Sequence, residues 1–165
     1  MDLAEKLRLA GVVGAGGGGF PAHVKLASKA DTVIANGAEC EPLLHKDAVL
    51  MEENPRELVR GMQLPMEAVG AKDGVIGIKS KKKQAVEPVE AACKDTNVRV
   101  KLLGDYYPAG DEYDLVYNVT GRLIPPTGFL LWVDVFGFRF AQKHEENRRQ
   151  GQDPEDHDEK QSVPC

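Results

Sequence analysis

Three short apolar runs, separated by stretches with helical periodicity, constrain the fold of this chain more than any other feature. The runs have the length and the β-branched content of buried strands, and they cover residues 32–35, 74–79 and 98–103. Helical patterns follow Asn54-Pro55 and extend over about 82–93. Strands that alternate with helices predict βαβ crossovers, and therefore a parallel sheet with flanking helices in the α/β class.

The ends of several helices can also be predicted. Gly11 should stop a short helix over residues 3–9, and Pro21 suits the first turn of the next helix. Asn54 is a good N-cap, with Pro55 at the first helical position and Glu57 reaching back to the cap.

Two prolines conflict with this pattern. Pro65 and Pro88 each fall inside a helix predicted from periodicity. An interior proline removes a backbone hydrogen bond and costs about 3 kcal/mol or more. We therefore expect kinks at these positions, or a marginally stable protein.

Composition excludes several classes of protein. With 26 acidic and 21 basic side chains the net charge is -5, which argues against nucleic acid as a partner. No apolar run approaches the roughly 20 residues of a spanning helix, and residues 1–6 lack the pattern of a signal peptide. The three cysteines are far apart, so a disulfide framework or a self-contained iron–sulfur or zinc site is not expected. This predicts an intracellular protein without direct membrane insertion.

A glycine-rich loop over residues 14–19 precedes Phe20-Pro21. Successive glycines let the backbone approach a ligand closely, and the following helix N-terminus suits phosphate. The loop lacks the spacing of a dinucleotide fingerprint and the Gly-Lys-Ser/Thr ending of a P-loop. As a bare string it is also typical of a flexible connector.

Two polar segments follow predicted strands. Residues 36–42 (NGAECEP) come after the first strand, and residues 107–112 (YPAGDE) come after the third. Ligands of open α/β sheets bind beyond the carboxyl ends of the strands, where these side chains would lie. The alternatives are a polar turn that caps the next helix, for the first segment, and acidic partners of a helix dipole, for the second.

Three smaller features have both a functional and a structural interpretation. Glu39, Glu41 and His45 fit no strong metal-ligand spacing, and His45 is better explained as the start of a helix. Cys40 is better explained as a packed neutral thiol than as a nucleophile. The basic run over residues 79–83 is typical of a solvated face, with a docking patch for an acidic partner or a nucleotide phosphate as the alternative.

Taken together, the motifs resemble the C subunit of the Rnf electron-transport complex and, more distantly, the flavin-bearing 51-kDa subunit of respiratory complex I. The resemblance spans about residues 8–128. The segments that carry it are residues 14–26 (GAGGGGFPAHVKL), 36–42, 46–47 (KD), 107–112 and 121–122 (GR). Ala15 and Ala38 stand where the complex I subunit often has arginine and an acidic residue, which favours the Rnf-like branch.

The resemblance implies a Rossmann-like domain that binds FMN and NAD(H). The residues that it assigns to the flavin are Gly14, Gly16, Gly17, Gly18, Asn36, Glu39, Tyr107, Gly110 and Asp111. Phe20 would stack against the nicotinamide nucleotide, and Lys25 would meet its phosphate or ribose. Glu41 and Glu112 would hold its polar groups.

The chemistry implied by the resemblance belongs to the cofactor. NADH would give a hydride to FMN, which would release single electrons to an iron–sulfur acceptor or a ferredoxin, and no side chain would act as acid, base or nucleophile. Iron–sulfur clusters are expected only in the full-length family. The expected partners are other subunits of a membrane-associated complex and a ferredoxin-like acceptor. The implied location is the cytoplasm, or the cytoplasmic face of a membrane through partner subunits.

The resemblance ends after Gly128, where composition changes abruptly. We expect three regions: a partial FMN/NADH-binding domain over residues 1–127, an aromatic-rich segment over 128–142, and a disordered charged tail over 143–165. The sheet would then be incomplete at its carboxyl-terminal side. Residues 129–140 would either cover it or form an exposed apolar patch. We interpret the change as a truncated or frame-shifted product.

Three functions are consistent with these motifs. The first is an FMN- and NADH-binding electron-transfer module. The second is a non-catalytic binding or assembly module that keeps the fold but holds no flavin. The third is a binder of nucleotide phosphates without redox chemistry.

Overall fold

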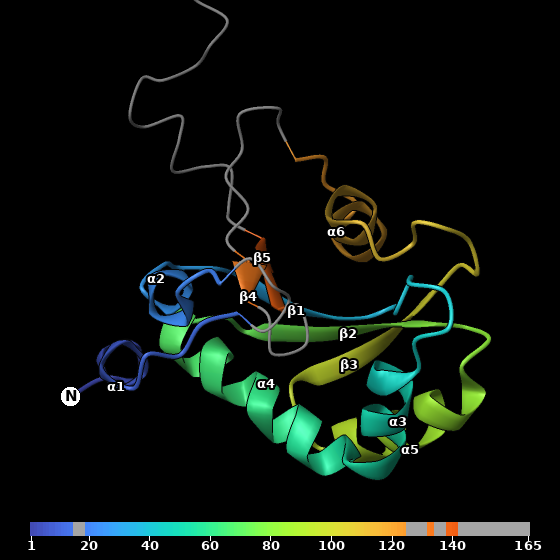
Figure 1. Ribbon diagram of the computed structural model, residues 1–165, viewed down its shortest axis with the longest axis horizontal. Helices are drawn as coiled ribbons and strands as arrows, with labels where there is room; N and C mark the ends of the chain where they lie inside the picture. The colour runs from blue at the N-terminus through green and yellow to red at the C-terminus, as the bar shows by residue number, and fades with distance from the viewer. Residues whose placement is uncertain (15–18, 125–131, 134–137, 142–165) are drawn as a thin grey trace, which may run out of the picture.

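The computed structural model describes residues 1–14, 19–124, 132–133 and 138–141 (Figure 1). The predicted tail and most of the aromatic-rich segment lie outside these residues. In chain order the elements are α1 (Leu3–Leu9), α2 (Ala22–Leu26), β1 (Thr32–Gly37), α3 (Lys46–Glu53), α4 (Pro55–Val69), β2 (Asp73–Lys79), α5 (Lys83–Cys93), β3 (Val98–Leu103), α6 (Glu112–Thr120), β4 (Trp132–Val133) and β5 (Phe138–Ala141).

The three predicted strands form the parallel part of one sheet, whose order is β3-β2-β1-β5-β4. β1 pairs with β2, and β2 with β3, both in parallel. Helices α3 and α4 connect the first pair, and α5 connects the second. The predicted α/β fold, a parallel sheet built from βαβ crossovers, is therefore confirmed. The carboxyl ends of all three strands meet at one edge of the sheet.

The open edge of β1 is occupied by β5, which pairs with it antiparallel from Thr32 opposite Ala141 to Ala35 opposite Phe138. β4 pairs antiparallel with β5 in turn. The sequence left open whether the aromatic-rich segment would cover the sheet. In the structure, part of that segment continues the sheet along the edge that the parallel strands leave unpaired.

Helices cover both faces of the sheet (Figure 1). Alternate residues of β1 point to opposite faces, so Val33 packs among the residues of α4 and α5, whereas Ile34 packs with Leu115 of α6. Both β1 residues are completely buried. Burial on both faces explains why β1 and β2 read as continuous apolar runs in the sequence instead of alternating ones.

Both interior prolines lie within helices that continue through them. Pro65 is buried inside α4, and Pro88 lies inside α5. The amphipathic face of α4 includes Met62 and Met66, which are nearly or completely buried. Packing of that face against the sheet offsets the lost hydrogen bond. The helical periodicity is therefore a better guide to α4 and α5 than the interior prolines are.

The helix ends differ from prediction in detail. α1 spans residues 3–9 as expected, and Gly11 follows it with φ +66°, a conformation that favours glycine. α2 starts at Ala22, so Pro21 takes the N-cap position instead of the first helical position. Pro55 does open α4, but the Asn54 side chain makes no capping hydrogen bond.

Candidate functional site

A polar cleft of about 490 Å³ lies at the carboxyl ends of the parallel strands. Its walls come from the loop after β1, the end of β2 with the turn that follows, and the loop after β3. The residues that line it are Glu39, Cys40, Glu41, Pro42, Leu43, Leu44, His45, Lys79, Lys81, Lys82, Asp105, Tyr106 and Tyr107. The sheet thus brings together polar segments that are far apart in sequence, at the edge where α/β sheets bind ligands.

Gly110 joins the loops after β1 and β3. The Asn36 amide Nδ2 donates a hydrogen bond to the Gly110 carbonyl at 2.9 Å, and the Gly110 N–H donates to Cys40 Sγ at 3.1 Å. A Cβ added at Gly110 would lie only 2.9 Å from Ala38 Cβ. Glycine is therefore required here by the close approach of two loops. The structure places Cys40 as an acceptor in this junction.

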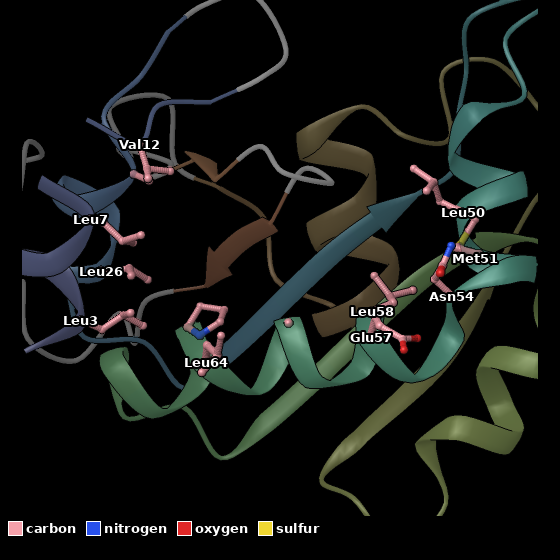
Figure 2. Close-up of a pocket in the computed structure, with 13 residues that line it drawn as sticks. Leu3, Leu7, Val12, Leu26, Leu50, Met51, Asn54, Glu57, Leu58 and Leu64 are labelled. Atoms are coloured by element: carbon pink, nitrogen blue, oxygen red, sulfur yellow. The ribbon is translucent and has the colours of Figure 1, made fainter. Parts of the chain in front are cut away.

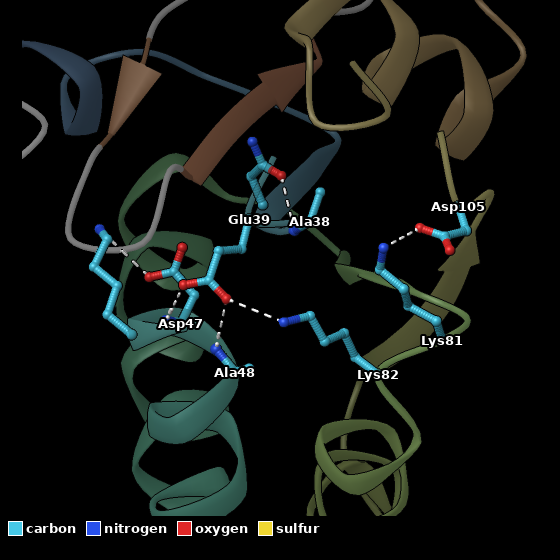
Figure 3. Close-up of polar contacts among 9 residues, drawn as sticks. Ala38, Glu39, Asp47, Ala48, Lys81, Lys82 and Asp105 are labelled. Atoms are coloured by element: carbon cyan, nitrogen blue, oxygen red, sulfur yellow. Dashed lines mark hydrogen bonds and ion pairs between the residues drawn. The ribbon is translucent and has the colours of Figure 1, made fainter. Parts of the chain in front are cut away.

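The buried side chain of Glu39 caps the N-terminus of α3, the next helix in the chain (Figure 3). Its side chain is 1% exposed, and its carboxylate accepts hydrogen bonds from the amides of Asp47 at 2.9 Å and Ala48 at 3.4 Å, in the first turn of α3. Lys82 Nζ lies 3.5 Å from the same carboxylate. For Glu39, the structure therefore shows the alternative interpretation of a turn that caps the next helix. His45 lies at the N-cap position of α3, as expected.

Asp111 has a similar role at the start of α6. Its carboxylate accepts hydrogen bonds from the amides of Tyr113 at 3.0 Å and Asp114 at 3.4 Å. Glu112 is the first residue of that helix. An acidic pair at a helix start stabilises the helix through its caps and its dipole, as the structural interpretation of this motif predicted.

Tyr107 and Glu41 are the exposed members of the predicted set. Tyr107 is 75% exposed, and Glu41 is exposed at the rim of the cleft. Among the described residues, no hydrogen bond or ion pair is made by the side chain of either one. Both side chains are therefore available to a ligand that enters the cleft.

The glycine loop is described only at its two ends. The Gly14 N–H donates to the Phe20 carbonyl at 2.9 Å, and Val13 forms an antiparallel bridge with Pro21, so these two ends lie side by side. Gly16, Gly17 and Gly18 lie outside the described residues. Their assignment to a ligand stays a prediction.

Phe20 and Lys25 contact each other. Lys25 is 1% exposed, and its Nζ lies 5.0 Å from the centroid of the Phe20 ring, within the range of a cation–π interaction. Neither residue lines the polar cleft. Of the predicted site residues, Glu39, Glu41 and Tyr107 line the cleft. Asn36 and Gly110 form the junction next to it through Cys40, Asp111 and Glu112 lie at the start of α6, and Phe20 and Lys25 lie at α2.

The lysines in the run over residues 79–83 have distinct positions that the sequence did not predict. Lys79 is buried and lines the cleft, whereas Lys81 pairs with Asp105 at 2.6 Å (Figure 3). The sequence carried one indication that Lys79 is buried. Lys79 is the last residue of the second apolar run, and the two-residue repeat of a strand places it on the same face of the sheet as Gly77.

A second hollow, of about 310 Å³, lies between α1, α2 and α4 (Figure 2). Apolar side chains make up most of its wall, including Leu3, Leu7 and Leu26, and the polar side chains are those of Asn54 and Glu57. Few polar groups converge on it, whereas nucleotide sites need several such groups to orient the ligand. We therefore place the candidate site at the polar cleft.

Two other kinds of feature are absent from the residues that the structure describes. Among them, no three His, Cys, Asp or Glu residues are grouped so that they could hold a metal ion. Nor does that part of the chain contain a helix with the length and apolar character needed to span a membrane.

Comparison with known proteins identifies the family. The family model described as the Nuo51 FMN-binding domain matches residues 7–138. The chain belongs to this family. The match continues past Gly128 and reaches β5.

Several curated relatives are similar over most of this chain. Cobalamin reductase PduS of Citrobacter freundii is 44% identical over 81% of the chain, and PduS of Salmonella typhimurium is 46% identical over 76%. The C subunit of the Na(+)-translocating ferredoxin:NAD(+) oxidoreductase complex of Acetobacterium woodii is 43% identical over 75%. The aligned part covers 28–29% of these relatives. The chain therefore spans less than a third of their length.

A solved structure supports the same assignment. An NAD+-reducing [NiFe]-hydrogenase in the air-oxidized state superposes with a TM-score of 0.64 at 27% identity. The superposition covers 74% of this chain and 24% of the hydrogenase chain. The resemblance to the Rnf C subunit and to the complex I flavin subunit is thus confirmed, as is the Rossmann-like fold. The chain is a domain of the kind found in subunits of electron-transfer oxidoreductases.

Proposed function

We propose that this chain binds FMN and NADH and forms the entry module of an electron-transfer oxidoreductase. The observation that carries the proposal is the junction of Asn36, Cys40 and Gly110 at the carboxyl ends of the strands, in a chain of the Nuo51 FMN-binding family. When bound, FMN would supply the redox chemistry, taking the hydride of NADH and passing electrons singly to an iron–sulfur acceptor.

The junction next to the cleft has polar groups that suit a flavin nucleotide. Asn36 uses one amide hydrogen on Gly110 and one lone pair on the Ala38 amide, which lies 3.2 Å from Oδ1. A primary amide has two hydrogens and two lone pairs, so one of each remains for a ligand. Because Gly110 has no side chain, the loops after β1 and β3 can pack closely enough to hold Asn36 in this position.

Of the other predicted residues, some would contact the nucleotide and others would hold the loops of the site in place. Tyr107 and Glu41 are free to contact a ligand, Tyr107 with the flavin and Glu41 with the polar groups of the nicotinamide nucleotide. Glu39 and Asp111 already cap helices, so they would hold the loops in place for the ligand. Gly14, Gly16, Gly17 and Gly18 would line the flavin. Phe20, Lys25 and Glu112 would contact the nicotinamide nucleotide.

The proposed function also requires partner proteins that accept the electrons. The chain spans less than a third of relatives such as the Acetobacterium woodii protein, which belongs to a ferredoxin:NAD(+) oxidoreductase complex. We propose that the iron–sulfur acceptor lies outside this chain, in other subunits or a ferredoxin-like protein. Attachment to a membrane would then depend on those partners. The proposed boundaries are a flavin-binding domain over residues 1–127 and additional segments over 128–142 and 143–165.

The test is a two-step titration. Addition of the chain should quench FMN fluorescence to saturation, and NADH added without oxygen should then bleach the flavin absorbance. Asn36→Leu should weaken FMN binding about tenfold, because a hydrogen bond in a binding site is worth about 1.4 kcal/mol. The matched control is Gln63→Leu, a half-buried amide of α4 outside the cleft.

The second candidate function is a non-catalytic binding or assembly module. It is favoured by the capping roles of Glu39 and Asp111, which explain both residues without a ligand. This candidate keeps the fold but holds no flavin, so a folded chain that does not bind FMN would support it and would refute the proposed flavin site. Saturable FMN binding would refute this candidate.

A further inference from the structure

Lys79, the last residue of β2, is buried in the wall of the cleft. It is 5% exposed. Among the described residues, no hydrogen bond, ion pair or ring contact reaches its ammonium group. Burial of a charge is costly unless it is paired, and most buried charges in proteins have a partner. An unpaired cation at this position therefore needs an explanation.

The neighbouring acidic residues do not supply that partner. Asp105 pairs with Lys81 at 2.6 Å, and Glu39 pairs with Lys82 at 3.5 Å while it caps α3 (Figure 3). The third carboxylate of the wall, Glu41, is exposed. The turn after β2 thus brings three lysines to the cleft but leaves one of them unmatched by the described part of the protein.

A helix N-terminus adds to the positive potential at this edge. α5 starts at Lys83, and its N-cap residue Lys82 makes no side-chain capping hydrogen bond. The first turn of α5 contains no acidic residue. An uncapped N-terminus presents free amide N–H groups and a partial positive charge, which together suit an anion.

We propose that Lys79 and the N-terminus of α5 bind a phosphate group of a nucleotide in the cleft. The cleft of about 490 Å³ is large enough for such a ligand. The phosphate can belong to FMN or to the diphosphate of the nicotinamide nucleotide; this choice of nucleotides rests on the proposed function. The phosphate site itself rests on the burial of Lys79.

Stability separates a ligand-binding lysine from a structural one. Lys79→Met keeps the shape of the side chain and removes the unpaired charge. The variant should therefore be at least as stable as the wild-type chain in a thermal melt without ligand. A clear fall in Tm would show that Lys79 supports the fold, and it would overturn the proposal.

Binding identifies the source of the phosphate. FMN, riboflavin, ADP-ribose, adenosine and inorganic pyrophosphate are titrated by calorimetry into the full chain, into Lys79→Met and into Lys94→Met. Lys94 is exposed, lies at the opposite end of α5 and does not line the cleft, so its variant controls for the same loss of charge. Lys79→Met should weaken pyrophosphate, and either FMN or ADP-ribose, about tenfold or more. Riboflavin and adenosine lack the phosphate and should be unaffected.

The outcomes distinguish the two proposals. If the wild-type chain binds pyrophosphate but neither FMN nor ADP-ribose, and Lys79→Met loses pyrophosphate, the phosphate site holds while the proposed function fails. If FMN binds and Lys79→Met binds all five ligands as the wild type does, the phosphate site is wrong while the flavin site holds. A wild-type chain that binds no phosphate compound would refute the phosphate site.

Discussion

Replacement of Glu39 by alanine should destabilise the chain, because this buried carboxylate holds the start of α3 to the loop after β1. The carboxylate accepts hydrogen bonds from Asp47 and Ala48 and lies 3.5 Å from Lys82. A helix cap is worth about 1 kcal/mol, and hydrogen bonds to a charged acceptor about 1.5–3 kcal/mol. The bond to Ala48, at 3.4 Å, is long. We therefore expect a total of about 2 kcal/mol.

The assay is urea unfolding followed by circular dichroism, with a thermal melt in parallel. A loss of about 2 kcal/mol corresponds to a fall in Tm of roughly 4–8 °C for a domain of this size. Glu41→Ala is the matched control, because Glu41 is exposed and its removal should change stability by less than about 0.5 kcal/mol. Equal stability of the two variants would refute the capping role of Glu39.

Two further predictions follow from local packing and charge. Gly110→Ala should cost about 1–3 kcal/mol in urea unfolding, since the new Cβ would lie 2.9 Å from Ala38 Cβ. Gly61→Ala, where a Cβ meets no atom within 4 Å, should be neutral or stabilising. Burial and the nearby Glu90 raise the pKa of the Cys93 thiol to about 11 from 9.0. The unfolded chain therefore ionises first, and stability should fall between about pH 9 and 11 more for the wild type than for Cys93→Ala. A constant difference across that range would contradict this pKa.

The sheet was predictable from the sequence because its inner parallel strands, β1 and β2, are buried on both faces and leave continuous apolar runs that periodicity detects. β3 lies at the edge of the sheet, where Arg99 is exposed, and its predicted range Val98–Leu103 coincides with the observed strand. The strand pairing of residues 138–141 was not predictable. Antiparallel addition to the edge of β1 depends on contacts between segments far apart in sequence, and no local pattern fixes the register of such a pairing.

The sequence predicted which motifs meet at the site, but it did not predict what each side chain does there. The expectation that polar segments after β1 and β3 meet follows from parallel strand order, and the Asn36–Gly110 hydrogen bond shows the contact. Whether a glutamate binds a ligand or caps a helix depends on where the next helix begins. That position is set by tertiary packing, so the role of Glu39 could not be read from the sequence. The burial of Lys79 was not predicted, because a run of lysines is usually exposed.

FMN titration of the purified chain tests the central claim most directly. Flavin fluorescence should be quenched saturably by the wild-type chain and by Gly61→Ala. Gly17→Val, which adds a branched side chain to the glycine loop, should lose the effect while keeping its circular dichroism spectrum. A folded wild-type chain that leaves FMN fluorescence unchanged, or a Gly17→Val variant that binds FMN as tightly as the wild type, would contradict a flavin site built on the glycine loop.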